Sequence, residues 1–130
     1  MAPHPYLMNT ALSVALVPLA LGFNALLRPA SALAIMGAPM PKEPDARKLT
    51  IALMSVYGAR NFTIGLTGTA IWYYGNVEAM GWLSVGGTIM MLVDGQVMKD
   101  VTGSGEWRHW CGVPIAVGLA IGLLTGVGGS

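Results

Sequence analysis

The sequence predicts an all-α integral membrane protein: a four-helix bundle with a short interfacial helix after the first span. Of the 130 residues, 54% are hydrophobic and only 10% are charged, and the mean hydropathy is +0.61. A soluble domain usually carries about 25% charged residues, so this chain could not easily cover its surface in water. The apolar residues also form four stretches long enough to cross a bilayer. We therefore expect one membrane domain over residues 1–130.

The first predicted span covers residues 6–27. At ~1.5 Å per residue, a helix of this length crosses a hydrocarbon core of ~30 Å. The segment lacks the positively charged start and short apolar region of a signal peptide, so it is expected to stay in the mature protein. Pro18 is expected to kink it. The apolar residues 30–37 after it predict the interfacial helix or a re-entrant turn, and the proline-rich, charged residues 38–48 predict a surface loop.

The other predicted spans cover residues 49–74, 79–98 and 110–127. Gly75 and Asn76 predict a tight turn between the second and third spans, and residues 99–109 form a polar loop before the fourth. All lysines and arginines except Arg60 fall in the first and third connections: Arg28, Lys42, Arg47, Lys48, Lys99 and Arg108. The positive-inside rule places these connections in the cytoplasm and both termini on the lumenal or outer face. We expect an endomembrane location, in the endoplasmic reticulum.

Several classes of function find no support in the sequence. The formal net charge of +1 leaves no basic patch for nucleic acid. The single cysteine, Cys111, excludes an intrachain disulfide. There is no CxxC, HExxH or paired-histidine spacing for a metal and no glycine-rich phosphate loop. The expected partners are the bilayer and a lipophilic small molecule, with no cofactor.

Arg60 interrupts the second span. A charged side chain at a helix centre costs about 2.5–3.5 kcal/mol on insertion scales, so it should face the bundle interior or a wet cavity, with a partner. Tyr57, Arg60 and Asn61 are spaced i, i+3 and i+4, which places them on one helix face. Asp94 is the only carboxylate inside a predicted span. We therefore predict that Arg60 and Asp94 face each other across a cavity open to the cytoplasmic leaflet.

These residue types suit general acid–base chemistry. An arginine keeps a neighbouring carboxylate ionised and oriented, the carboxylate can accept a proton, and a tyrosine hydroxyl can donate to a developing oxyanion. Opening an epoxide needs these parts, and so do the proton transfers of an isomerase. An Arg–Asp pair can equally be a structural link between helices. The predicted catalytic residues are Asp94 as base, Arg60, Tyr57 and Asn61, and the predicted substrate-binding residues are Asn24, His109, Met90 and Met91.

Short segments throughout the chain resemble a family of small fungal four-helix membrane proteins that carries a domain-of-unknown-function label. They are residues 22–29, Gly37, Pro39, GARNFTIGL at 58–66, the DG pair at 94–95, and His109. Some members of that family are encoded beside polyketide synthases and are assigned as epoxide hydrolases or cyclases. They act on polyene-pyrone epoxides in pathways of the aurovertin and citreoviridin kind.

The resemblance implies a cofactor-independent epoxide hydrolase or cyclase of secondary metabolism, and it points to Arg60, Asn61 and Asp94. The same chemical parts are similar to those of the soluble limonene-epoxide hydrolases, whose fold is unrelated. Those enzymes use two carboxylates, whereas Asp94 is alone within the predicted spans. The second carboxylate would be Asp45, Asp100 or none.

A non-catalytic protein is the alternative: a membrane scaffold or carrier for a lipophilic intermediate, or a subunit of a larger complex. Gly118, Gly122 and Gly126 form a small-xxx-small ridge on the fourth span, which allows close helix contact within one chain or in a homo-oligomer. This ridge fits both readings. Turnover of an epoxide by the purified protein alone would separate them.

Overall fold

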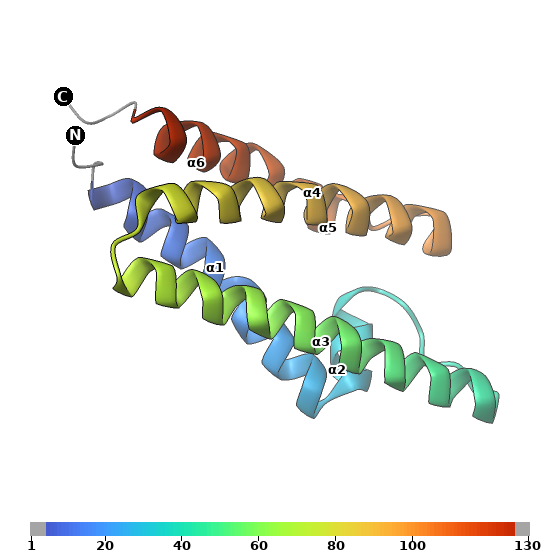
Figure 1. Cartoon of the computed structure of the whole chain (residues 1–130). Helices are drawn as coiled ribbons and strands as arrows, with labels where there is room; N and C mark the ends of the chain where they lie inside the picture. The colour runs from blue at the N-terminus through green and yellow to red at the C-terminus, as the bar shows by residue number, and fades with distance from the viewer. Residues whose placement is uncertain (1–4, 127–130) are drawn as a thin grey trace.

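The computed structural model describes residues 5–126 and is all-helical over that range, as predicted (Figure 1). The helices are α1 (Pro5–Leu27), α2 (Pro29–Ile35), α3 (Pro44–Tyr73), α4 (Val77–Thr102), α5 (Trp107–Trp110) and α6 (Val113–Thr125). The short helix predicted after the first span is confirmed as α2. The start of α1, the α3–α4 turn and the end of α6 lie at one end of the molecule (Figure 1). We call this the terminal end.

The helix α3 begins at Pro44, five residues earlier than predicted. The Glu43 carboxylate caps it by accepting hydrogen bonds from the backbone N–H groups of Asp45 (3.0 Å) and Ala46 (2.6 Å). Proline suits the first turn of a helix, because its missing N–H would have no partner there. The predicted surface loop over residues 38–48 is therefore wrong in its last part, where the charged residues already belong to the helix.

The helix α4 is longer at both ends than the predicted 79–98. At its start the Asn76 side chain accepts a hydrogen bond from the backbone N–H of Ala79 (2.9 Å), and at its end Gly103 adopts a φ of 73°. That left-handed conformation is the usual end of a helix and is easiest for glycine. The predicted tight turn at Gly75 is confirmed, with φ 68° at that residue.

The predicted fourth span, 110–127, consists of two helices. The short α5 ends at Trp110, and α6 restarts at Val113 with Pro114 in its first turn, a position that tolerates proline. The polar loop predicted over residues 99–109 is also partly helical, because α4 runs through Lys99 to Thr102 and α5 begins at Trp107. Val127, the predicted end of the span, lies outside the described residues.

Three helical stretches in the described part of the chain are long and apolar enough to cross a membrane: Pro5–Leu27, Val77–Thr102 and Trp107–Thr125. The longest helix, α3, does not reach that apolarity. Arg60 and Asn61, together with the glycines and threonines around them, lower its hydropathy. Length and composition therefore support a membrane protein with three spans, and the second predicted span, which corresponds to α3, is less apolar than the others.

The helices pack as two pairs, α1 with α3 and α4 with α6. Glycine lets the first pair approach until the backbones touch. A Cβ added at Gly22 would lie 2.7 Å from the carbonyl oxygen of Gly58 and would also meet the Phe62 backbone, and one at Gly65 would lie 2.6 Å from the nitrogen of Leu19. Small residues drive such close packing where water provides no hydrophobic force between helices. These glycines belong to the segments that carry the family resemblance, but their role in helix packing was not predicted.

Two clusters of buried apolar side chains complete the fold. The first joins α1, α4 and α6 near the terminal end; the second joins α1, α2 and α3 near the other end. They consist of Met8, Ala11, Met80, Leu119 and Leu123 in the first, and Ala25, Ala32, Leu33 and Met54 in the second. Only the first cluster connects the two helix pairs. Away from the terminal end, the pairs can therefore enclose a cavity.

Candidate functional site

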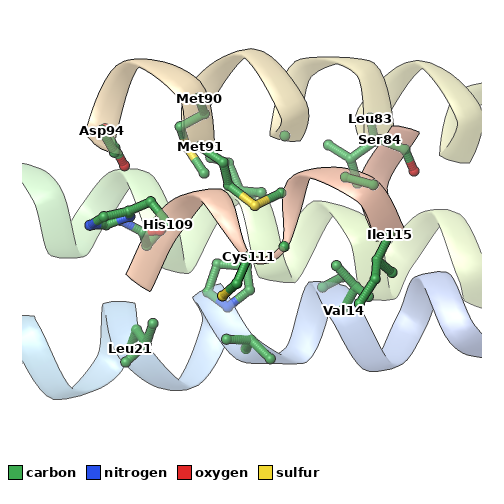
Figure 2. A pocket seen from close by; sticks show the side chains of 18 of the residues that line it. Val14, Leu21, Leu83, Ser84, Met90, Met91, Asp94, His109, Cys111 and Ile115 are labelled. Atoms are coloured by element: carbon green, nitrogen blue, oxygen red, sulfur yellow. The ribbon is translucent and has the colours of Figure 1, made fainter. Parts of the chain in front are cut away.

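A cavity of about 560 Å³ lies between the two helix pairs (Figure 2). Its volume falls in the range of about 300–1,000 Å³ that is usual for small-molecule sites. Aliphatic side chains such as Val14, Leu21, Leu83 and Ile115 form much of the wall. Its polar lining is confined to Tyr57, Asn61, Ser84, Asp94, Arg108 and His109 among side chains that carry nitrogen or oxygen. An apolar cavity with few polar groups suits a lipophilic ligand that is oriented by one polar part.

Arg60 and Asp94 form the predicted ion pair. The guanidinium donates two hydrogen bonds to the carboxylate, Nη2 to Oδ2 at 2.7 Å and Nη1 to Oδ1 at 3.2 Å. A bidentate pair of this kind fixes the plane of the carboxylate as well as its charge. The prediction that these two residues meet is confirmed, and the pair links α3 to α4.

The two partners do not lie across the cavity from each other, and in this respect the prediction is wrong. Asp94 lines the cavity, whereas Arg60 lines a smaller groove of about 360 Å³, to which Asp94 and Tyr57 also contribute. The Arg60 side chain is 40% exposed and that of Asp94 is 16% exposed. The long guanidinium side chain therefore reaches Asp94 from the outer side of the wall. The carboxylate stands between the groove and the cavity.

Tyr57 and Asn61 flank this pair on α3. The Arg60 guanidinium carbon lies 5.3 Å from the centroid of the Tyr57 ring, a cation–π distance. Asn61 is only 4% exposed, and its Nδ2 donates to the backbone carbonyl of Tyr57 (2.9 Å). Within residues 5–126, no hydrogen bond engages the Tyr57 hydroxyl or the Asn61 carboxamide oxygen. Both groups line the cavity and remain for a ligand.

His109 lies at the same end of the cavity as Asp94 (Figure 2). The adjacent Trp110 explains this position. Its indole packs on Gly95, where a side chain would collide with the ring, and its Nε1 donates to the carbonyl of Leu92 (3.3 Å). The glycine after Asp94 therefore lets α5 lie against α4. This contact brings His109, a predicted substrate-binding residue, to the site.

The remaining predicted binding residues divide into two groups. Met90 and Met91 line the cavity from α4 (Figure 2). Asn24 is not among the lining residues, and its amide donates instead to the Ser31 hydroxyl of α2 at 3.5 Å. The structure therefore does not bring Asn24 together with the other predicted site residues.

The two candidates for a second carboxylate also lie elsewhere. Asp45 is exposed in the first turn of α3, and Asp100 accepts a hydrogen bond from the Gln96 side chain at 2.9 Å. Neither lines the cavity. Asp94 is thus the cavity's one carboxylate among the described residues. Over the same residues, no group of three histidine, cysteine, aspartate or glutamate side chains could hold a metal ion.

Arg108 is a site residue that the sequence reading treated only as a loop charge. Its Nη1 donates to the carbonyl oxygen of Ile35 (2.7 Å), the last residue of α2, and so ties α5 to α2. Gly37, in the left-handed region at φ 82°, makes room for it: a Cβ there would lie 2.5 Å from the same nitrogen. Cys111 also lines the cavity and was assigned no role. Nothing in the sequence around Gly37 indicates that its neighbour in the fold is Arg108.

The site thus holds an oriented carboxylate with a hydroxyl, an amide oxygen and an imidazole at one end of an apolar cavity. Comparison with curated proteins and with solved structures finds no match. The family described as Domain of unknown function (DUF4267) matches residues 15–124, which include all or part of every helix in the described chain and both members of the ion pair. The chain belongs to this DUF4267 family.

Proposed function

We propose that the protein is a membrane-embedded enzyme that opens the epoxide of a lipophilic, polyketide-type substrate by general acid–base catalysis. One observation carries this proposal: Asp94, held by two hydrogen bonds from Arg60, lies at one end of an apolar cavity of about 560 Å³. The similarity to small fungal membrane proteins of polyene-pyrone pathways supports the substrate class. The reaction needs no cofactor.

In the proposed reaction, Asp94 takes a proton from water or from a hydroxyl of the substrate. The oxygen so activated forms a bond to one epoxide carbon while the carbon–oxygen bond of the ring breaks. The released oxygen takes up a proton, and Tyr57 and His109 are the cavity groups that can deliver it. Asn61 positions the nucleophile or the epoxide oxygen. Arg60 stays protonated and balances the charge of Asp94.

The proposed topology has four spans. It adds α3 to the three apolar helical stretches, although α3 is less apolar than they are. The ion pair between Arg60 and Asp94 makes a charged residue within this helix compatible with a membrane span, because intramembrane charges are tolerated when they are paired or face a cavity. The proposed location is the endoplasmic reticulum, with both termini lumenal. The loop charges support this orientation.

A carrier or scaffold is the second candidate function, and a membrane isomerase is a further catalytic one. The geometry that favours a non-catalytic protein is the bidentate pairing itself, because both carboxylate oxygens of Asp94 already accept a hydrogen bond. Each oxygen can still accept a second one, so the pairing does not prevent proton transfer. A carrier would bind a polyene-pyrone epoxide and release it unchanged.

The test is epoxide turnover by the purified protein in lipid vesicles. Asp94→Asn keeps the shape of the side chain but removes its basicity, and should lower the rate by about 10²–10⁴-fold. The matched control is Asp100→Asn on the same helix, because Asp100 is exposed and does not line the cavity. Full activity of a folded Asp94→Asn variant would make the pair structural. Binding without turnover by the wild type would favour the carrier.

A further inference from the structure

The cavity reaches the molecular surface mainly through apolar side chains, although Arg108 and Cys111 of its wall are exposed as well. Val17 of α1, Ile35 of α2 and Ile115 of α6 all line it. The same three residues are 57%, 53% and 53% exposed. Residues that belong both to a cavity wall and to the surface mark its mouth. We call these three residues the lateral mouth.

Two of the three mouth residues, Val17 and Ile115, lie at the depth of the hydrocarbon core, whereas Ile35 lies nearer the end that holds Arg108. Val17 is near the middle of α1, roughly 15–18 Å from either end of that helix at ~1.5 Å per residue. Ile115 is near the middle of the stretch Trp107–Thr125, which is also apolar enough to span. In a bilayer, exposed valine and isoleucine at this depth contact lipid chains rather than water.

Packing and a hydrogen bond join the helices toward the two ends of the cavity. Toward the terminal end, the buried cluster around Met80 and Leu119 joins α1, α4 and α6. At the other end, the hydrogen bond from Arg108 to the Ile35 carbonyl bridges α5 and α2. A hydrophobic molecule therefore finds an apolar opening at the side, whereas a molecule from water meets a guanidinium bridge.

We infer that the ligand reaches the cavity sideways from the bilayer, through the lateral mouth between α1 and α6. The ligand is a membrane-dissolved, elongated molecule: its apolar chain lies along the aliphatic wall and its one polar end lies at Asp94. The identity of that polar end rests on the proposed function. The route depends only on the position and exposure of the mouth residues.

Cys111 provides a reporter for this route, because it is the chain's one cysteine, lines the cavity and is exposed. The full chain is reconstituted in phosphatidylcholine vesicles and treated with pyrene maleimide, which dissolves in the bilayer, or with a sulfonate-bearing methanethiosulfonate, which stays in water. Labelling should be at least about tenfold faster with the bilayer-soluble reagent, relative to the reaction of each reagent with protein unfolded in detergent. Even a factor of ten corresponds to only ~1.4 kcal/mol of barrier difference.

Tryptophan substitutions then test the mouth itself. Val17→Trp and Ile115→Trp should each slow labelling by pyrene maleimide, again by about tenfold or more. Leu16→Trp and Ile121→Trp are the matched controls on the same two helices, because both residues are exposed but do not line the cavity. The controls should label as the wild type does. Gel filtration shows whether each variant remains folded.

Two results would overturn the inference: water-borne reagent labelling Cys111 as fast as pyrene maleimide, or mouth variants labelling as fast as their controls. A wild type that labels only after unfolding would overturn it too. Since labelling requires no catalysis, failure of the proposed function is seen separately. A protein that labels as expected but turns over no epoxide keeps the route and loses the enzymatic assignment.

Discussion

At Arg60 and Asp94, geometry assigns different tasks to the two charges. Asp94 lines the cavity, whereas Arg60 contacts it from the outer groove. A guanidinium on that side can orient the carboxylate without occupying the space of a ligand. Tyr57 contributes to both surfaces and packs its ring near the same guanidinium. The arrangement separates the group that would react from the group that holds it.

Replacing Arg60 by alanine should therefore reduce both activity and stability. The substitution leaves Asp94 without its counter-ion, and we expect a loss of about 1–3 kcal/mol in the free energy of unfolding. This is below the ~3–5 kcal/mol of a fully buried pair because the Arg60 side chain is 40% exposed. Unfolding in detergent measures it. In an Asp94→Asn background the same substitution should cost less, and an equal cost in both backgrounds would show that the pair contributes nothing.

Part of this site could be predicted from the sequence. The two charges were the only ones of their sign within predicted spans, so their pairing followed from the cost of burying either alone. The side of the wall on which Arg60 lies could not be predicted, because it depends on how α3 rotates against α1 and α4. The same dependence on packing explains why Asn24 bonds Ser31 rather than lining the cavity.

Among the elements, the α1–α3 pair depends most on glycine. Gly58 and Gly65 are seven residues apart on α3, and both are buried against α1. Spacings of this kind keep a seam of small residues facing one partner helix. This spacing is present in the sequence, but the predicted small-residue ridge was that of the last span, Gly118, Gly122 and Gly126. There, a Cβ added at Gly118 would meet nothing within 4 Å among residues 5–126, whereas one at Gly122 would meet the Leu7 side chain at 3.2 Å. The prediction that this ridge forms a homo-oligomer remains a prediction.

Gly22→Ala should destabilise the pair, because the added methyl group would collide with the backbone of α3. Overpacking of this kind typically costs about 1–3 kcal/mol. Gly86→Ala is the matched control: Gly86 is also within a helix, but an added Cβ there meets nothing within 4 Å in the part of the chain that the structure describes. It should be neutral or stabilising by about 0.5–1 kcal/mol, the helix advantage of alanine over glycine. Unfolding by denaturant in detergent measures both, and equal effects would contradict the close approach.

The Glu43 cap at the start of α3 lies outside the spans, and its contribution to stability should depend on pH. Hydrogen bonds from the backbone N–H groups of Ala46 and Asp45 lower the pKa of Glu43 below its ordinary value of 4.5. Because the folded-state pKa is depressed, the cap stabilises the helix fully above pH 4.5 and is lost as the pH falls through the lowered value. The amide proton shift of Ala46, followed by NMR, should titrate with a midpoint below 4.5. Glu43→Gln should abolish the step, and a midpoint above 4.5 in the wild type would contradict the cap.

These helix ends show why element boundaries were harder to predict than the elements. The length of each apolar stretch predicts a long helix, because unpaired backbone groups are costly in lipid and a helix pairs them within one segment. The prolines at 41 and 44 predict a loop. In the structure, Pro44 instead follows a capping carboxylate and opens a helix. A proline after an acidic residue fits a loop as well as a helix start. Only the hydrogen bonds from the backbone N–H groups to the Glu43 carboxylate decide between the two.

For the whole molecule, the main feature is its division into two helix pairs joined near the terminal end. The ion pair and the Arg108 bridge are the polar links that join the pairs across the rest of the described chain. All the loop arginines and lysines lie in the connections away from the terminal end, at or near α2, the start of α3, the end of α4 and α5. This asymmetry bears on orientation in the membrane.

The orientation predicts that the C-terminus is lumenal. A glycosylation acceptor fused after Ser130 should be modified in the endoplasmic reticulum, because the positively charged connections hold the opposite side in the cytoplasm. The same acceptor inserted between α2 and α3 should remain unmodified, which provides the control. Modification of the inserted acceptor alone would reverse the topology.

The division into pairs also has a consequence for biosynthesis. The first pair is complete once Tyr73 has been made, and Arg60 precedes its carboxylate partner by 34 residues. A ribosome that adds about 5–20 residues per second needs roughly 2–7 s to make that interval. If helices leave the translocon in order, Arg60 is without Asp94 for that time. Its partner on the same helix is then the Tyr57 ring. Newly made chains interrupted in this interval carry Arg60 without its carboxylate partner, and a charge within a helix is costly in lipid.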